Sequence, residues 1–157
     1  MNNGLFKDRV SVQQVEESLD LAPSFDINGL LPVVTTDIKT GDVLMVGYMN
    51  RESLELTIKT KKAHYWSRSR QKIWQKGQTR GLFQNVKELR IDDDQDSLWL
   101  KVDVEGSGAS CHVGYKSCFY REILTDENKG VSLKYRETEK IFDPLEIYGD
   151  VPNPTKL

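Results

Sequence analysis

The stretch Asp96-Ser-Leu-Trp-Leu-Lys-Val-Asp-Val-Glu105 is the clearest β-strand signal in the chain. Leucine and valine occupy every second position of its central part, and tryptophan, lysine and aspartate stand between them. Because successive side chains of a strand point to opposite faces of a sheet, this alternation predicts a strand with one buried face. The segment from Phe83 to Arg90 predicts a second strand just upstream, so the residues between the two form their connection.

A hairpin and a helix are predicted ahead of these two strands. Residues 31–37 and 43–49 are rich in apolar and β-branched residues, and the Thr-Gly-Asp turn between them predicts a β-hairpin. Asn50 then predicts the N-cap of a helix over residues 51–60, with Leu54 facing the core.

The two ends of the chain carry weaker signals. Residues 1–30 predict an N-terminal arm in which Ser11 and Gln14 cap a helix, helical spacing continues to Leu19, and Pro23 ends it. A strand is expected to resume over residues 117–121. The segment 126–157 is rich in Lys and Glu and is expected to be an arm or a partly disordered tail.

Residues 59–80 form a basic stretch that contains aromatic residues and no acidic ones. Hydroxyl and guanidinium groups stand side by side in Ser67-Arg-Ser-Arg70, and such groups suit phosphate oxygens. The predicted substrate-binding residues are Trp66, Arg68, Ser69, Arg70 and Lys76. A solvated basic loop is the alternative interpretation, but it would leave tryptophans exposed. Nucleic-acid binding also uses such residues, although the net charge of −2 argues for a small phosphorylated ligand instead.

Two candidate metal-binding segments flank the central strand. Both cysteines of the chain, with one of its two histidines between them, lie in Cys111-His-Val-Gly-Tyr-Lys-Ser-Cys118, and thiolates suit zinc. Four aspartates lie in Asp92-Asp-Asp-Gln-Asp96, and clustered carboxylates suit magnesium. We expect the two segments to be two metal sites of one hydrolytic centre. The alternatives are plain buried cysteines or a disulfide, and a solvated acidic loop.

An extended backbone across the aspartates would divide them into two sets. Asp92, Asp94 and Asp96 would point to one side and Asp93 to the other.

The length and composition of the chain limit the class of protein to which it can belong. A chain of 157 residues fits a single domain, 1–157, that can bury a core without disulfides. No apolar run approaches the ~20 residues that cross a bilayer, and no secretory signal is visible. We therefore expect a cytoplasmic protein with reduced thiols, which favours metal ligation over a disulfide.

Several segments together resemble the phosphoribosyl-AMP cyclohydrolase family. They are Met49–Glu52, Ala63–Arg70, Trp74–Gly77, Asp92–Asp96 and Cys111–Arg121. The resemblance covers about residues 30–125, and the sequence His-Tyr-Trp-Ser-Arg-Ser-Arg combined with paired cysteines is very specific.

The resemblance implies an α+β fold with a compact mixed or antiparallel sheet, few helices and an intertwined homodimer with active sites at the subunit boundary. It implies a hydrolase that opens the adenine ring of 1-(5-phosphoribosyl)-AMP between N1 and C6, the third step of L-histidine biosynthesis. It also implies a small-molecule nucleotide substrate, with no nucleic acid or membrane as partner. No fused pyrophosphohydrolase domain is expected in residues 126–157.

The resemblance further implies one Zn²⁺ per subunit, held by cysteines of both subunits, and Mg²⁺ held by aspartates. Carried over by position, Cys111 and Cys118 match zinc ligands, and the magnesium ligands match Asp92, Asp94 and Asp96. The family pattern has a third cysteine where this chain has Asp93, so either Asp93, His112 or another nearby group completes the zinc site, or zinc binding is weakened. His112, or else His64, would carry the proton. The chain also departs from the pattern at Gln78, Arg80 and Leu82.

Three other functions compete with this interpretation. Another zinc nucleobase deaminase would carry His-x-Glu and Pro-Cys-x-x-Cys, and neither motif occurs in the sequence. A non-enzymatic nucleotide- or RNA-binding module would leave the cysteines and aspartates unexplained. A closed structural zinc site would need more than two cysteines per chain.

Overall fold

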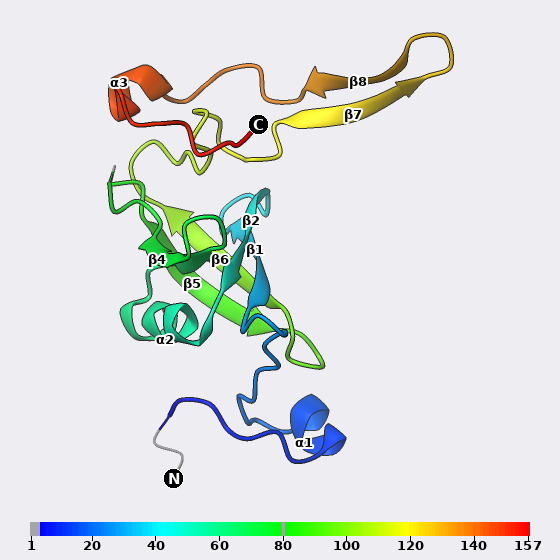
Figure 1. Ribbon diagram of the computed structural model, residues 1–157, viewed down its shortest axis with the longest axis vertical. Coiled ribbons are helices and arrows are strands. Elements are labelled where there is room, and N and C mark those ends of the chain that lie inside the picture. Colours follow the sequence, from blue (N-terminus) through cyan, green and yellow to red (C-terminus); the bar gives the residue numbers. More distant parts are fainter. Residues whose placement is uncertain (1–3, 80) are drawn as a thin grey trace.

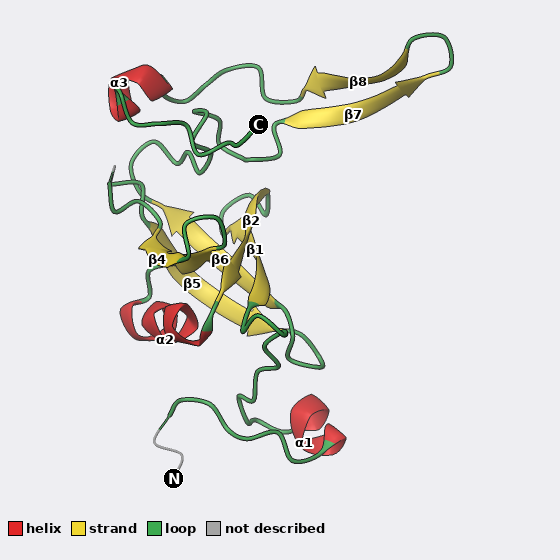
Figure 2. Ribbon diagram, viewed as in Figure 1, coloured by secondary structure: helices red, strands yellow, loops and turns green. Residues whose placement is uncertain are grey.

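A four-stranded mixed sheet forms the centre of this computed structural model, which describes residues 4–79 and 81–157 (Figure 1, Figure 2). Its strands, in order across the sheet, are β2 (Val43–Met49), β1 (Leu31–Asp37), β6 (Leu98–Val104) and β5 (Gln84–Ile91). β1 runs parallel to β6, whereas the outer strands are antiparallel to their neighbours. The sheet confirms the strands and the hairpin predicted from the sequence.

Strand β6 has the buried face that its alternation predicts. Leu98, Leu100 and Val102 are 3%, 0% and 0% exposed, and they pack with apolar residues of β1 and β2 in one core. The strand lies between β1 and β5, so both of its edges are hydrogen-bonded. The sheet therefore fixes the positions of both ends of β6, where the preceding and following segments begin.

Helix α2 (Arg51–Thr60) and the ribbon of β3 (His64–Ser67) and β4 (Lys72–Gln75) pack beside this sheet. Asn50 caps the helix as predicted, because its side chain and that of Ser53 accept hydrogen bonds from each other's backbone N–H. A Cβ atom on Gly47 would lie only 2.9 Å from the nearest ring carbon of Tyr65, which is too close for a real side chain. A glycine in β2 thus lets the ribbon approach the sheet.

The N-terminal arm contains helix α1 (Val12–Glu17), which is shorter than the sequence predicts. Ser11 caps it as expected by accepting a hydrogen bond from the Gln14 N–H. The helix ends several residues before Pro23, and Leu19 is fully exposed instead of continuing the apolar stripe. The extension of the helix to Pro23 was therefore wrong.

The C-terminal part of the chain, in contrast, is more structured than expected. Strands β7 (Arg121–Asp126) and β8 (Gly130–Tyr135) form a second ribbon, and helix α3 (Pro144–Tyr148) follows it. The ribbon projects away from the central sheet in Figure 1. The strand expected over 117–121 begins only at Arg121, because residues 117–120 belong to the loop of residues 106–120 that contains both cysteines.

The described part of the chain therefore has an α+β fold with few helices and a mixed sheet, as predicted. In residues 4–79 and 81–157, no helix has the length and apolar character that crossing a bilayer requires. The division into one domain with an N-terminal arm and a C-terminal tail stays a prediction.

Candidate active site

The cysteine loop, residues 106–120, follows β6 and is fastened to the sheet by hydrogen bonds. The Cys118 N–H donates to the Leu44 carbonyl at 2.7 Å, and the Ser117 hydroxyl donates to the Val43 carbonyl at 2.6 Å. Lys116 Nζ lies 3.3 Å from Asp37 and 2.8 Å from Asp42, two residues that flank the β1–β2 turn. The loop is thus held to the hairpin end of the sheet at several points.

The thiols of Cys111 and Cys118 are hydrogen-bonded to each other and are not joined by a disulfide. This bond from Cys118 lowers the pKa of Cys111 to about 6, and the nearby Lys76 ammonium acts in the same direction. The same bond, together with burial, raises the pKa of Cys118. The pair therefore holds one proton near neutral pH, and a soft cation has a preformed thiolate to bind.

A cavity of about 630 Å³ opens beside the two cysteines. One wall comes from the basic stretch and includes Arg70, Lys72, Trp74 and Lys76. The cysteine loop supplies Ala109–His112 and Cys118. The opposite wall comes from the C-terminal segment, between Pro144 and Pro154. Cationic, aromatic and thiol groups therefore face one space of the size that small-molecule ligands occupy.

Lys76 lies closest to the cysteine loop among the predicted phosphate-binding residues. Its Nζ donates to the Ser110 carbonyl at 2.6 Å and lowers the pKa of Cys111. Arg70 lines the same cavity, whereas Trp66, Arg68 and Ser69 do not. Arg68 instead stacks over the ring of Tyr48, 4.0 Å from its centroid. The binding roles of these residues stay predictions, and the cavity brings two of the five together.

The two histidines occupy different surroundings. His112 lines the cavity next to Cys111, and its Nε2 is buried. His64 is buried in β3, where its ring Nδ1 lies 2.8 Å from the Lys62 carbonyl and its backbone N–H donates to the Thr57 hydroxyl. His64 does not line the cavity. Of the two histidines, His112 is therefore the one that lines the cavity.

A buried polar network connects the ribbon to the cysteine loop. The Tyr65 hydroxyl lies 2.7 Å from the Thr35 hydroxyl and donates to Gln84 Oε1 at 2.6 Å. Gln84 Nε2 in turn donates to the Ser110 hydroxyl at 3.5 Å. Burial raises the pKa of Tyr65, so its hydroxyl stays protonated and keeps this network intact.

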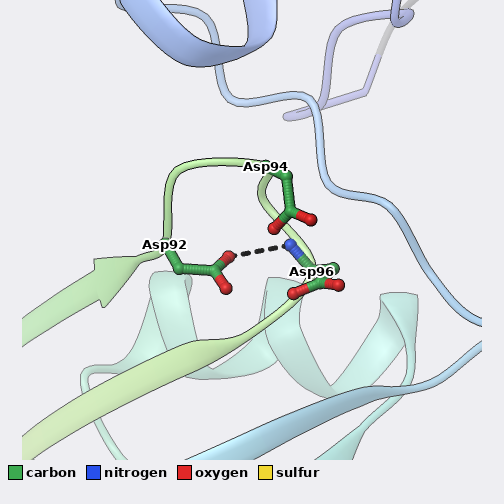
Figure 3. Close-up of side chains that lie close together, drawn as sticks. All are labelled: Asp92, Asp94 and Asp96. Carbon is green, nitrogen blue, oxygen red and sulfur yellow. Dashed lines mark hydrogen bonds between the residues drawn. The ribbon is translucent and has the colours of Figure 1, made fainter.

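The aspartates form a turn between β5 and β6 (Figure 3). The backbone is not extended as expected, because Gln95 adopts the left-handed region at φ 60°. The carboxylates of Asp92, Asp94 and Asp96 nevertheless lie within 4.8 Å of one another. They form the one group of three or more His, Cys, Asp or Glu donors so close together among the described residues.

The carboxylates of this turn lie close enough to affect one another's pKa. Burial alone would raise the pKa of Asp92, but the N–H groups of Ser97 and Asp96 hold it below its ordinary value. The Ser97 hydroxyl would lower the pKa of Asp96, but the hydrogen bond with Asp92 and the charges of Asp92 and Asp94 outweigh it and raise that pKa. A bound cation would relieve this repulsion.

The two donor sets lie at opposite ends of β6 (Figure 1). The aspartate turn precedes this seven-residue strand and the cysteine loop follows it. Such a strand extends roughly 20 Å, which exceeds the reach of one metal centre. The sequence analysis expected the aspartates and cysteines to form one hydrolytic centre, but within one chain the structure keeps them apart. Asp93 belongs to the turn and lies with the aspartates.

The sequence did not identify the C-terminal segment as part of the site. Pro144, Leu145, Tyr148 and Val151 line the cavity. Asp143 followed by proline is a helix-start signal that could have located α3, but nothing in the sequence places that helix beside the cysteines. Gln78 and Leu82 also line the cavity, and Arg80 lies outside the described residues.

Known proteins resemble this chain over most of its length. The profile of the family described as phosphoribosyl-AMP cyclohydrolase matches residues 45–120. A phosphoribosyl-AMP cyclohydrolase of Nitrobacter winogradskyi is 49% identical over 138 residues, which cover 88% of this chain and 94% of that protein. Proteins of the same name from Rhodopseudomonas palustris and Rhizobium etli are 52% and 50% identical, cover 85% and 86% of this chain, and are themselves covered over 90% and 89%. The chain therefore belongs to the phosphoribosyl-AMP cyclohydrolase family.

Proposed function

We propose that the chain opens the adenine ring of 1-(5-phosphoribosyl)-AMP in the cavity beside Cys111 and Cys118. As a member of its family, the chain is a phosphoribosyl-AMP cyclohydrolase, a hydrolase of histidine biosynthesis. The observation that carries the proposed site is the meeting of two thiols, His112 and cationic side chains in one cavity. The reaction adds water at C6 of the purine and breaks the N1–C6 bond, so N1 takes up a proton.

The chain's own residues would bind and orient the substrate. Arg70 and Lys72 face the cavity and suit the two phosphates of the substrate. Trp74 offers an aromatic face for the purine, and its ring is already supported by Tyr65, whose centroid lies 5.1 Å away. We expect His112, which lines the cavity, to carry the proton between water and N1.

The cysteine pair fits a zinc ion only in part. The thiolate of Cys111 and the adjacent Cys118 are soft donors of the kind zinc prefers. A bound zinc ion would supply Lewis-acid chemistry that lowers the pKa of a water molecule to about 7. A catalytic zinc site usually has three protein ligands. Among the described residues, no third His, Cys, Asp or Glu donor joins the two cysteines within 4.8 Å, so a further ligand must come from elsewhere.

The three aspartates fit a magnesium ion better. Their carboxylate oxygens converge and are exposed, so water molecules can complete the six oxygen ligands that Mg²⁺ prefers. The raised pKa of Asp96 indicates negative charge that a divalent ion would offset. We assign Asp92, Asp94 and Asp96 to this ion, which would help to orient the phosphates of the substrate.

A homodimer would unite the two donor sets. The cysteines and the aspartates lie at opposite ends of β6, and a second copy can bring its aspartate turn to the cysteine loop of the first. Asp93 of one subunit would then supply the missing zinc ligand of the other. The exposed apolar side chains of the β7–β8 ribbon support an interface there, since Ile123 and Val131 are 71% and 73% exposed. A cytoplasmic location is consistent with reduced thiols and with a biosynthetic role.

Turnover of the N1-phosphoribosylated nucleotide, followed by ultraviolet absorbance, tests this function. We expect activity that exhaustive chelation abolishes and that Zn²⁺ with Mg²⁺ restores. Cys111→Ala should abolish both zinc binding and activity, while Lys87→Ala, at an exposed position of β5, should retain both. Undiminished turnover after all divalent ions are removed would contradict the proposal.

A further inference from the structure

Gln95 lies inside the aspartate turn, between Asp94 and Asp96, but it is unlike its neighbours. Gln95 is 4% exposed, whereas the three aspartates around it are exposed. Its backbone has φ 60°, a region that a residue with a side chain rarely adopts. A buried polar side chain at a strained position needs compensating contacts.

Those contacts come from the N-terminal arm. Gln95 Nε2 donates to the Val15 carbonyl at 2.9 Å and to the Asp20 carbonyl at 3.1 Å. Gln95 Oε1 accepts from the Ala22 N–H at 2.8 Å. Its own carbonyl accepts from the Ser24 N–H at 2.7 Å. Four hydrogen bonds thus join this single residue to a segment more than seventy positions away in the sequence.

The same residue sets the shape of the aspartate turn. The Gln95 N–H donates to the Asp92 carbonyl at 3.2 Å, and the left-handed backbone at Gln95 reverses the chain before Asp96. This reversal lets the Asp96 N–H reach the Asp92 carboxylate at 2.9 Å, the hydrogen bond drawn in Figure 3. The convergence of the three carboxylates therefore depends on the conformation that the arm stabilises.

We propose that Gln95 is a positioning residue that couples docking of the N-terminal arm to divalent-cation binding at Asp92, Asp94 and Asp96. This inference rests on the proposed function, which assigns Mg²⁺ to these aspartates. The arm holds Gln95, and Gln95 holds the turn in the shape that gathers the carboxylates. By linkage, a cation that prefers the gathered turn tightens the docking of the arm by the same factor.

Gln95→Gly tests the coupling, because glycine tolerates φ 60° and only the side-chain hydrogen bonds are lost. We expect its Mg²⁺ dissociation constant, measured by isothermal titration calorimetry, to rise about tenfold, within the range typical of coupled sites. Trypsin should cleave after Lys7 or Arg9 faster in this variant, and Mg²⁺ should no longer slow the cleavage. The matched control is Gln71→Gly, since Gln71 has φ 51° but lies exposed in the β3–β4 turn, away from the arm.

Hydrogen exchange of the unaltered protein gives a second test that needs no variant. Mg²⁺ should slow exchange of the Ala22 and Ser24 amides, which donate to Gln95. Unchanged exchange of these amides at saturating Mg²⁺, or an unchanged Mg²⁺ affinity in Gln95→Gly, would overturn the coupling and leave the proposed cation site standing. Absence of Mg²⁺ binding to the unaltered protein would overturn both.

Discussion

Cys111 has an acidity that differs strongly from that of a free cysteine side chain. Hydrogen bonding from Cys118 lowers its pKa to about 6, from an ordinary value of 9.0. The thiolate of Cys111 is therefore present at neutral pH before any metal binds. Because zinc binds thiolates, only one of the two cysteines must still lose its proton when the ion enters.

Ultraviolet absorbance of the thiolate in metal-free protein should show this directly. We expect one thiolate per folded chain to form with a midpoint near pH 6, and the signal to be absent in Cys111→Ser. Since the pKa is lower in the folded chain than in the unfolded one, this ionisation stabilises the folded state increasingly as the pH rises from about 6 toward 9.0, and the contribution is lost below about 6. A midpoint close to 9.0 in the folded protein would contradict the assignment.

Asp93 is the second informative residue, because the resemblance implied by the sequence predicts a cysteine at its position. It is exposed at the aspartate turn, so its replacement should leave the fold intact. Asp93→Cys should tighten zinc binding roughly tenfold or more, since a thiolate is a softer ligand than a carboxylate. Competition with a chromogenic chelator measures the affinity.

Lys87→Cys is the matched control for this change, because it adds a thiol at an exposed position of β5. Equal zinc affinity in the two variants would mean that Asp93 does not face the zinc ion. A loss of structure in Asp93→Cys, seen by circular dichroism, would show that the carboxylate has another role.

At the scale of elements, Gly114 joins the cysteine loop to the C-terminal segment. Its φ is +106°, and a Cβ there would lie 2.3 Å from the Phe142 carbonyl oxygen. The Ile141 N–H donates to the Gly114 carbonyl at 2.7 Å. The two segments therefore touch along their backbones, and this contact positions α3 against the cavity.

Gly114→Ala should push the C-terminal segment off the cysteine loop. We expect KM for the nucleotide to rise about tenfold with a smaller change in kcat, because the displaced residues contribute binding surface more than chemistry. Gly130→Ala is the matched control, since Gly130 also has a positive φ of +76° but nothing lies within 4 Å of its Cβ position. The same KM in both variants would exclude the C-terminal wall from substrate binding.

The elements that could be predicted are those with one buried face. Strands β1, β2 and β6 and helix α2 bury alternating or helically spaced apolar residues, so their patterns follow the core. The β7–β8 ribbon was not predicted, although Val131, Leu133 and Tyr135 alternate with Ser132 and Lys134 in β8. All these residues are exposed, so the alternation does not mark a face buried in the core. The aromatic run Phe119-Tyr120 resembles a strand, but it ends a loop whose shape depends on contacts with the sheet.

The sequence predicts which residue types form the candidate site but not how they are arranged. Thiols suit zinc and clustered carboxylates suit magnesium, so residue types alone suggest the candidate ligands, and these assignments stay predictions. Which cations face the cavity depends on how the β3–β4 ribbon turns, and that placed Arg70 at the cavity and Arg68 over Tyr48. The C-terminal wall depends on a contact between Gly114 and Ile141 that no local pattern encodes.

At the scale of the whole molecule, the separation of the donor sets predicts complementation between subunits. A double variant Asp92→Ala/Asp94→Ala and the variant Cys111→Ser should each be inactive alone. In a mixed dimer, one of the two centres would receive intact aspartates from one subunit and intact cysteines from the other. Unfolding and refolding an equal mixture should therefore recover about one quarter of the wild-type activity, because half of the dimers are mixed.

The control for this experiment is a mixture of Cys111→Ser with Cys118→Ser, which alter the same end of β6. Their mixed dimers have no centre with both cysteines intact, so this mixture should stay inactive. Recovery in the control, or none in the test mixture, would contradict a centre built from two subunits.

The C-terminal wall has a practical consequence for handling the protein. Residues 151–154 border the cavity and lie close to Leu157 in the sequence. A polyhistidine purification tag fused after Leu157 would place a row of imidazoles close to the cavity that the two thiols line. There the imidazoles could capture the zinc ion or obstruct entry of the nucleotide. Recombinant material with its tag at the other terminus, or with the tag cleaved, is the appropriate reagent for metal analysis.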